Sequence, residues 1–271
     1  MTETNRNGDE RSILSGVDDL IDEHFRFTGI GQRPQYKHKK SCAELCESSS
    51  PEREILPLIE RIYERIEANW NTSKYHNPSK ENWRFEKQKL VGADNKKEVA
   101  LERAIVNIPK EIWPDAACWV NQVPVASGLV DQWGDKRRAI DLVYRREDGS
   151  YEFIELKVDE SGGTPLLAAM EILQYGLLYV FSREKTELLN QLNEKSELLQ
   201  AQNIHLMVMA PAAYYSGYDL GWLEEAINCG LIGFRSERKY SFQIDFEFES
   251  LSLAMSRSPA IWDERKKTGA E

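Results

Sequence analysis

Cysteine and histidine are scarce in this chain, with four of each among 271 residues. The start, Met1 to Arg11, is polar and acidic and has neither the basic head nor the apolar stretch of a secretory signal. Without such a signal a disulfide framework is not expected. We find no apolar run of about 18 residues, so no segment is expected to span a bilayer. These absences predict a cytoplasmic protein.

Several catalytic motifs are also missing: a nucleophilic serine elbow, a glycine-rich phosphate loop and a histidine pair with metal spacing. His38, Cys42 and Cys46 recur every four residues, which would align them on one helix face. No fourth ligand of matching spacing follows, so free thiols are favoured over a zinc site. His205 lies in an apolar run and is interpreted as structural.

The overall composition is ordinary for a soluble globular protein, with 41% hydrophobic and 30% charged residues. A chain of 271 residues suits one large domain, or one domain with a modest appendage. The formal net charge of −10 argues mildly against broad attraction to nucleic acid, which depends on Lys and Arg. A local basic groove is still compatible with this charge.

The chain divides by composition into four parts. Residues 1–50 are polar and irregular, and we expect a mobile or loosely packed segment with one short helix around Ser12 to His24. Residues 51–81 are expected to form a helical arm and linker, because Pro51 to Trp70 has one apolar stripe. This helix is also a candidate homodimer contact. The main domain is expected over residues 82–262, followed by a charged tail at 263–271.

Hydrophobic periodicity and turn signals predict the elements of the main domain. The order is helix, three strands, two helices, strand, helix, strand. We place them at Asn95–Asn107, Ala117–Val125, Arg138–Arg146, Tyr151–Asp159, Thr164–Ser182, Arg183–Gln200, Ile204–Ala210, Tyr218–Cys229 and Ser241–Glu249. This alternation predicts an α/β fold with a mixed central sheet flanked by helices.

The second and third strands are separated by Glu147-Asp148-Gly149, which suits a three-residue hairpin loop ending on a left-handed glycine. With that loop, Asp141 lies opposite Glu155, and Lys157 shares their face because side chains alternate along a strand. A two-residue Asp-Gly loop would shift the register by one residue and break this alignment.

Two carboxylates and an ammonium on one face of a hairpin are suited to metal chemistry. Carboxylates a few ångströms apart repel unless a cation joins them, and a divalent cation such as Mg²⁺ takes oxygen ligands. A bound metal acidifies a water molecule and neutralises charge on a phosphate. The simpler interpretation is a solvated Asp–Glu–Lys salt bridge, because this pattern by itself is common.

Beyond the trio, the sequence resembles the PD-(D/E)xK nuclease superfamily. Ile140-Asp141 is followed after thirteen residues by Glu155-Leu156-Lys157, with the Glu-bearing helix Glu98–Ile105 before and the helix Ala168–Tyr179 after. The resemblance covers roughly residues 95–210 and implies a restriction-endonuclease-like αβββαβ core with an N-terminal helical extension. Ile140 stands where the name-giving Pro would be, a departure that is frequent in the family.

The resemblance implies roles for the hairpin residues. Asp141 and Glu155 would ligate Mg²⁺, for which Mn²⁺ can substitute. The carbonyl of Leu156 is a further candidate ligand. Lys157 would assist the nucleophilic water.

It also implies roles for the flanking helices. A glutamate of the first helix would complete the metal shell, and Glu102 is favoured over Glu98, because Glu98 can be explained as a capping partner of Asn95. Gln174, in the Gln174-Tyr175 pair, would support the site or touch the nucleic-acid backbone. Packing at the edge of the core is an equally good interpretation of Gln174.

The function implied is a metal-dependent nuclease that hydrolyses phosphodiester bonds, with DNA as the expected partner. The alternative is a non-catalytic relative that binds nucleic acid or another protein. Two basic groups, residues 136–146 and 235–239, are candidate phosphate contacts. Residues 71–89 mix aromatic and basic side chains, which suits either single-stranded nucleic acid or packing between domains.

Overall fold

The computed structural model describes residues 12–27, 34–47, 54–74, 76, 82–87, 97–107, 118–128, 138–159, 163–185 and 196–251. The helices are α1 (Val17–His24), η1 (Gln35–Lys37), α2 (Lys39–Glu47), α3 (Leu56–Thr72), α4 (Lys97–Val106), α5 (Pro165–Glu184), η5 (Glu197–Gln200), α7 (Ala212–Tyr215) and α8 (Gly221–Arg238). The strands are β1 (Trp119–Pro124), β2 (Ala139–Arg145), β3 (Tyr151–Leu156), β4 (Asn203–Ala210) and β5 (Gln243–Ser250).

The strands form one mixed sheet in the order β1-β2-β3-β4-β5. The first three strands pair antiparallel, whereas β3, β4 and β5 pair parallel. Helices α5 and α8 provide the crossovers that parallel pairing requires. The predicted α/β class and mixed sheet are confirmed. Most of the helix predicted at Arg183–Gln200 lies outside the described residues. Its described ends differ from the prediction, because Arg183 and Glu184 continue α5 and Glu197–Gln200 form the 3-10 helix η5.

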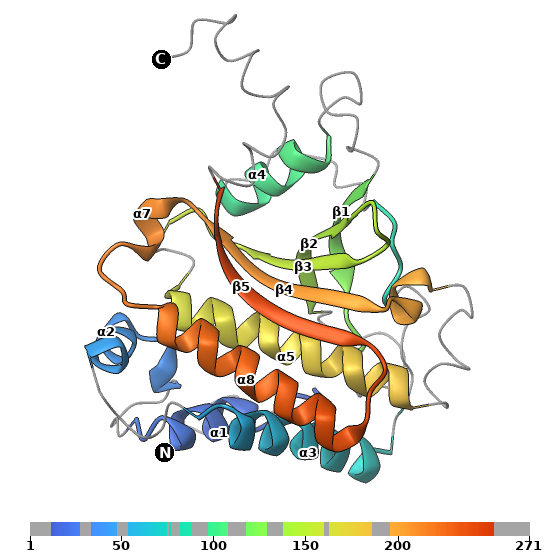
Figure 1. Cartoon of the computed structure of the whole chain (residues 1–271), viewed down its shortest axis with the longest axis horizontal. Coiled ribbons are helices and arrows are strands. Elements are labelled where there is room, and N and C mark those ends of the chain that lie inside the picture. The colour runs from blue at the N-terminus through green and yellow to red at the C-terminus, as the bar shows by residue number, and fades with distance from the viewer. Residues whose placement is uncertain are drawn as a thin grey trace, which may run out of the picture.

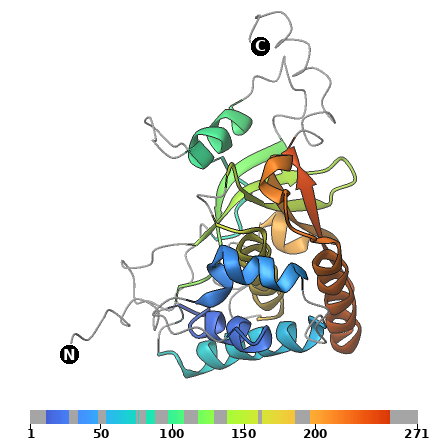
Figure 2. The same cartoon turned by 90° about the vertical axis from the view of Figure 1, so that its left-hand side faces the viewer.

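Helices cover both faces of the sheet (Figure 1). Val143 and Phe153 lie in the larger core, on the face that packs against α5, and α3 lies beyond that helix. Leu142 and Ile154 belong to a smaller cluster on the other face, which includes Ile105 of α4. Figure 2 shows the same layering from the side. Glu155 and Lys157 are buried between these layers, whereas Asp141 is partly exposed.

Helix α5 is the central packing element. The Thr164 hydroxyl caps it by accepting from the N–H of Leu167 at 3.2 Å, and Pro165 opens its first turn, as the sequence predicts. Gly176 allows close approach to the sheet, because a Cβ there would lie 2.6 Å from Leu206. Contrary to expectation, α5 is long and apolar enough to cross a membrane by length and composition, although most of it is buried inside the molecule.

The expectation of loose packing does not hold for the described part of residues 1–50. Ile13, Val17 and Ile21 are fully buried in the main core. The side-chain amide of Asn69 in α3 donates to the carbonyls of Ile13 and Ser15, at 2.9 Å each. The apolar residues of this segment are therefore buried in the core beside α3. The polar residues that dominate its composition lie on its outward face.

Helix α3 begins at Leu56, five residues later than the predicted start at Pro51, with Pro57 in its first turn. Residues 50–53 lie outside the described residues. The predicted apolar stripe is buried against α5 and α8 of the same chain: Leu58, Ile59, Ile62, Tyr63, Ile66 and Trp70. The helix is thus part of the core rather than an arm, and the stripe that suggested a homodimer contact is used within the chain.

Aromatic residues between α3 and α4 also enter the core. Trp83 is fully buried, stacks on Phe153, and donates from its indole N–H to the Ser182 hydroxyl at 3.0 Å. Phe85 packs edge-on against Tyr151. Of the two interpretations of this aromatic and basic stretch, packing therefore applies to the described residues.

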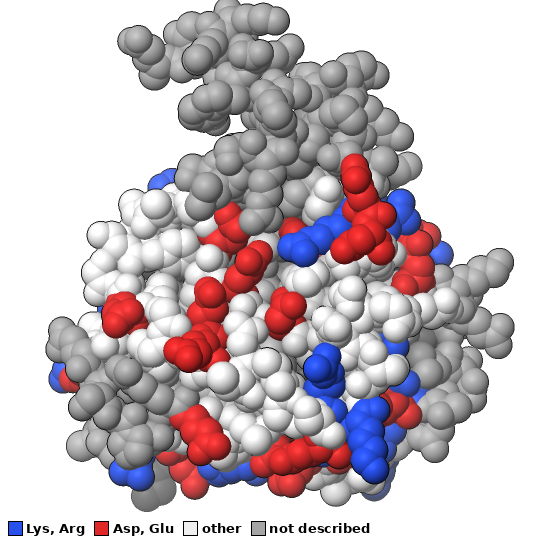
Figure 3. Space-filling view, in the orientation of Figure 1, with Lys and Arg blue, Asp and Glu red and all other residues white. Residues whose placement is uncertain are grey.

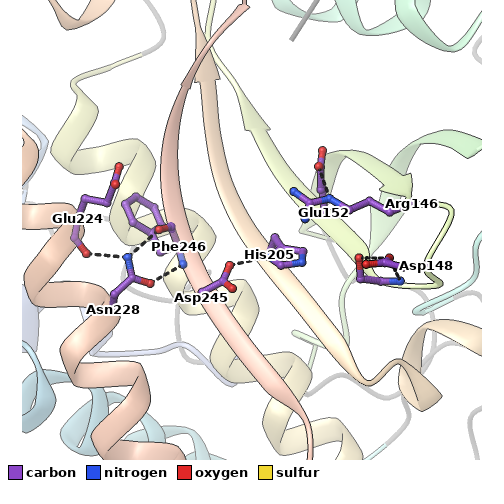
Figure 4. A network of polar contacts seen from close by, with 9 residues as sticks. Arg146, Asp148, Glu152, His205, Glu224, Asn228, Asp245 and Phe246 are labelled. Carbon is purple, nitrogen blue, oxygen red and sulfur yellow. Dashed lines mark hydrogen bonds and ion pairs between the residues drawn. The ribbon is translucent and has the colours of Figure 1, made fainter. Parts of the chain in front are cut away.

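The outer edge of β5 is covered by side chains of α8 (Figure 4). The Asn228 amide accepts from the N–H of Phe246 and donates to its carbonyl, both at 2.8 Å. Glu224 accepts from the N–H of Phe248 at 2.9 Å. These side chains satisfy backbone groups of β5 that a neighbouring strand would otherwise satisfy. They therefore block an edge that could pair with another chain.

Candidate active site

The predicted hairpin register is confirmed. The N–H of Arg146 donates to the Ser150 carbonyl at 2.9 Å, and Gly149 takes the left-handed conformation with φ of 81°. Leu142 pairs with Ile154, in the register that the three-residue loop predicts. Asp141 therefore lies opposite Glu155, and alternation places Lys157 on the same face, toward α5.

Asp141 lies where β2 and β3 separate. Backbone pairing ends at Leu142 and Ile154, and the next inward N–H of β3, that of Leu156, donates instead to the Asp141 carboxylate at 3.0 Å. Burial raises the pKa of Asp141 to about 7, although the Lys157 ammonium and the Leu156 N–H act in the opposite direction. The hydrogen bond from Leu156 therefore fixes the position of the Asp141 carboxylate, while burial makes its ionised form unfavourable.

Lys157 lies between two carboxylates. Its Nζ is 2.6 Å from Oε1 of Glu155 and 3.7 Å from Oε2 of Glu171, a residue of α5. Burial raises the pKa of Glu155 well above its usual range, and the neighbouring charges of Asp141 and Glu171 add to this. Burial alone would lower the pKa of Lys157, but Glu155 and Glu171 outweigh it and raise that pKa. Lys157 is therefore a stable ammonium.

Glu102 of α4 reaches the same strands from the other side of the sheet. It is buried and accepts from the amides of Asn121 and Gln122 in β1, at 2.7 Å each. The Gln122 amide also lies 3.4 Å from Oδ1 of Asp141. Glu102 and Asp141 are thus connected through one amide. Glu98 lies a turn earlier and is less buried. The metal role expected of Glu102 stays a prediction.

The cluster contains more acidic than basic groups among the described residues. The carboxyl groups of Asp141, Glu155 and Glu171 surround the Lys157 ammonium, and burial and crowding raise the pKa of Asp141 and Glu155 in the metal-free fold. Carboxylate oxygens are the ligands that Mg²⁺ and Mn²⁺ prefer, so the donor set fits a hard divalent cation. Over the described ranges, however, no three His, Cys, Asp or Glu side chains converge as ligands of one ion. Glu102 is not gathered into a single ligand set with Asp141 and Glu155.

No family model, curated protein or solved structure matches the chain. The geometry of the cluster and the order of the elements around it are therefore the observations on which a functional proposal depends.

Gln174 is buried on α5, and its amide donates to the Met170 carbonyl at 3.0 Å. It also contacts the hydroxyl of Tyr36 in η1, which donates to Asp18 at 2.5 Å. The contacts of Gln174 in the described structure are therefore with its own helix and with the N-terminal segment. These contacts are of the packing kind, and the contact of Gln174 with a nucleic-acid backbone stays a prediction.

Two polar residues of the cluster were not predicted. Glu171 is the one charged residue between Pro165 and Ser182, and such an isolated acid on an apolar helix was an available signal. Gln122 belongs to the Asn121-Gln122 pair in the middle of an otherwise apolar strand. Its left-handed backbone, with φ of 49°, could not be foreseen from that pair.

Several described members of the two basic groups lie away from the cluster. Arg145 and Arg146 pair with Glu197 and Glu152 near the amino end of β3, whereas the cluster lies at its carboxyl end. Arg238, at the end of α8, stacks on Tyr63 at 4.1 Å. Acidic side chains predominate on the face that carries β5 and α8 (Figure 3). The charge of Arg138, which directly precedes β2, acts on the hydroxyl of Tyr175 in α5.

The remaining metal-type residues do not join the cluster. Cys42 and Cys46 are free thiols on α2, and His38 is exposed just before that helix. His205 is half-buried, and its Nδ1 lies 2.7 Å from Asp245 on the neighbouring strand (Figure 4). This pairing across β4 and β5 suits the structural role predicted for His205.

Proposed function

We propose that this chain is a divalent-metal-dependent nuclease of the PD-(D/E)xK type, which hydrolyses phosphodiester bonds in DNA. The observation that carries the proposal is the buried cluster at the carboxyl end of β3. There Asp141 and Glu155 lie opposite each other, and the Lys157 ammonium contacts Glu155 at 2.6 Å.

Packing gives no reason for this cluster. Both faces of the sheet are otherwise apolar near it, with Val143 and Phe153 on the same face and Leu142 on the other. Replacing buried ion pairs by apolar side chains is often neutral or stabilising, so a charged cluster inside a core is not a device for stability. Its crowded carboxyl groups, whose pKa values are raised in the metal-free fold, instead favour a bound cation, which would stabilise their ionised form.

The order of the elements also supports the proposal. Helix α4, strands β1 to β3, helix α5 and strand β4 follow one another, and the acids lie on the two middle strands. This is the αβββαβ order expected of a restriction-endonuclease-like core. In the same interpretation, α1 to α3 form the N-terminal helical extension.

Asp141 and Glu155 would hold Mg²⁺ or Mn²⁺, with the Leu156 carbonyl as a further ligand and Glu102 acting through Gln122 or a water molecule. The cation would supply a water of lowered pKa and neutralise charge on the phosphate. Lys157 stays protonated between Glu155 and Glu171, so its part is to donate hydrogen bonds to the water or to a phosphate oxygen.

The test is cleavage of plasmid, single-stranded DNA and RNA by the purified chain with Mg²⁺, with Mn²⁺ and with a chelator. We expect metal-dependent cleavage of DNA that falls by about 100-fold or more in Lys157→Ala and Glu155→Gln, as for removal of one stabilising donor. The matched control is Lys97→Ala, which removes an exposed lysine paired with Asp159 and should retain full activity. Equal cleavage by wild type and Lys157→Ala would contradict the proposal.

One observation favours the alternative of a non-catalytic nucleic-acid-binding or protein-interaction subunit. Over the described ranges the acids do not converge as a three-ligand set, and Arg145, Arg146 and Arg238 are engaged with other side chains. The same cleavage assay separates the two functions. Retention of DNA in a filter-binding assay, with no cleavage under any metal, would favour the alternative.

A further inference from the structure

Two cysteines of α2 lie on one face of that helix, one turn apart. Cys42 is almost completely buried, whereas Cys46 is half-buried. Residues four apart on a helix have neighbouring side chains, and the two thiols are in hydrogen-bond contact. The site therefore contains one sulfur that solvent reaches and a second sulfur directly behind it.

The surroundings of the two sulfurs differ. Cys46 lies beside the backbone N–H of Asp219, just before α8. Cys42 contacts Thr164 and the backbone of Leu166, at the start of α5. Each sulfur thus lies beside the amino end of a long helix, where N–H groups point outward.

These contacts give the two thiols different pKa values, with Cys46 the more acidic. The hydrogen bond from Cys42 lowers the pKa of Cys46, and the Asp219 N–H acts in the same direction, while burial and the Asp219 carboxylate oppose this. The hydrogen bond to Cys46 and burial raise the pKa of Cys42. The thiolate is the nucleophilic form of cysteine, so the more accessible sulfur is also the more reactive one.

We propose that Cys46 is a peroxide-reactive thiol and that Cys42 is its resolving partner. The Cys46 thiolate attacks one oxygen of hydrogen peroxide, so an S–O bond forms, the O–O bond breaks, and hydroxide leaves and is protonated to water. The Cys42 sulfur then attacks the Cys46 sulfenic acid; its own proton and the departing hydroxyl leave as a second water. The product is a Cys42–Cys46 disulfide, and a cellular dithiol reduces it.

Disulfide formation has a structural consequence. Side chains four apart on a helix have Cβ atoms roughly 5–6 Å apart, whereas a disulfide brings them to about 3.5–4.5 Å. The turn of α2 between the two cysteines must therefore tighten or unwind. The effect can reach the start of α5 through Thr164, so oxidation links this region to the helix that carries Glu171.

The chain contains its own controls for the test. Cys229 is exposed on α8, and Cys118 is partly exposed. Folded wild type, Cys42→Ser, Cys46→Ser and Cys229→Ser proteins are treated with hydrogen peroxide at neutral pH, and peptides are mapped by mass spectrometry. A sulfenic-acid-specific carbon nucleophile is included in a parallel reaction.

We expect a peptide linked through Cys42 and Cys46 in wild type and Cys229→Ser, with the loss of two hydrogens. Cys42→Ser should trap the sulfenic acid on Cys46, and Cys46 should react roughly ten-fold faster than Cys229 despite its lower exposure. Oxidation of Cys229 at the same rate as Cys46 would overturn the proposal. So would sulfenic acid on Cys46 in wild type with no link to Cys42.

Discussion

Gln122 lies opposite Asp141 in the register of β1 and β2, and its amide lies between the carboxylates of Asp141 and Glu102. Asn121 pairs with Leu142 and Val123 pairs with Ile140, so the register is the same on both sides, but Gln122 and Asp141 are not themselves paired. Because φ of Gln122 is 49°, its side chain departs from the regular alternation and reaches Glu102 together with Asn121. A strained residue with contacts to two acids suggests that the conformation serves the site.

Two substitutions of Gln122 distinguish the effect of its side-chain amide from the effect of its left-handed backbone. Gln122→Ala and Gln122→Gly both remove the amide, and both should weaken Mg²⁺ binding measured by calorimetry. Glycine tolerates a positive φ whereas alanine does not, so the glycine variant should be more stable to urea by about 1 kcal/mol. Equal stability of the two variants would show that the left-handed backbone is not maintained in solution.

Lys157 should also matter for stability in the absence of metal. Lys157→Ala leaves Glu155 and Glu171 next to each other without their ammonium, and breaking a buried pair in this way costs about 3–5 kcal/mol. The loss should be larger at pH 8 than at pH 5, because Glu155, whose pKa is raised by burial, can take up a proton at the lower pH. Urea denaturation measures this.

The control for Lys157 is Lys97→Ala. Lys97 pairs with Asp159, but its side chain is 75% exposed, so solvent and salt screen the interaction. The control should therefore unfold at nearly the same urea concentration as wild type. A Lys157→Ala midpoint that coincides with this control would mean that the buried pair is not formed.

Sequence reasoning succeeded where local rules determine the structure. The loop Glu147-Asp148-Gly149 admits few hairpin geometries, and the choice of a three-residue loop was enough to align Asp141 with Glu155. The cap at Thr164 followed from side-chain chemistry that acts within one turn. These features depend on residues that are close together in the chain.

It was less successful where contacts are distant in sequence. Glu171 reaches Lys157 only because α5 packs on β3, and periodicity alone does not say which residue of a helix faces a strand. The packing of Ile13 near Asn69 likewise links segments whose polar composition suggested mobility. The start of α3 was misplaced because Pro51 and Pro57 both suit a first turn, and tertiary packing decides between them.

The closed edge of β5 gives a prediction that does not depend on function. Asn228→Ala removes both hydrogen bonds to Phe246 and should lower stability by about 1–2 kcal/mol, because a backbone N–H and carbonyl lose their partners. The exposed strand edge should also promote self-association at high concentration. Urea denaturation and sedimentation velocity measure the two effects.

Ser236→Ala is the control on the same helix. Its hydroxyl donates to the Ile232 carbonyl at 2.8 Å in an exposed turn, so its removal should change neither stability nor association appreciably. If Asn228→Ala remains monomeric and as stable as Ser236→Ala, the side-chain cap does not protect the edge.

The raised pKa of Asp141 predicts a specific dependence of stability on pH. Burial raises this pKa from 3.8 to about 7 in the metal-free fold, so the folded state binds the proton more tightly than the unfolded state. Below about pH 4, Asp141 is protonated in both the folded and the unfolded states. As pH rises from about 4 to about 7, the unfolded state ionises first, and the folded state loses stability progressively. Asp141→Asn keeps an acceptor for the Leu156 N–H but cannot ionise.

In the metal-free state, Asp141→Asn should therefore become more stable than wild type as pH rises from 4 to 8, by roughly 1.4 kcal/mol for each unit of pKa shift. A divalent cation should reverse this order at pH 8, because it binds the wild-type carboxylates and stabilises the fold by mass action. Thermal unfolding at both pH values, with Mg²⁺ and with a chelator, gives the four measurements. A variant that tracks wild type at every pH would mean that Asp141 is well solvated, and an unchanged order with Mg²⁺ would mean that no cation binds there.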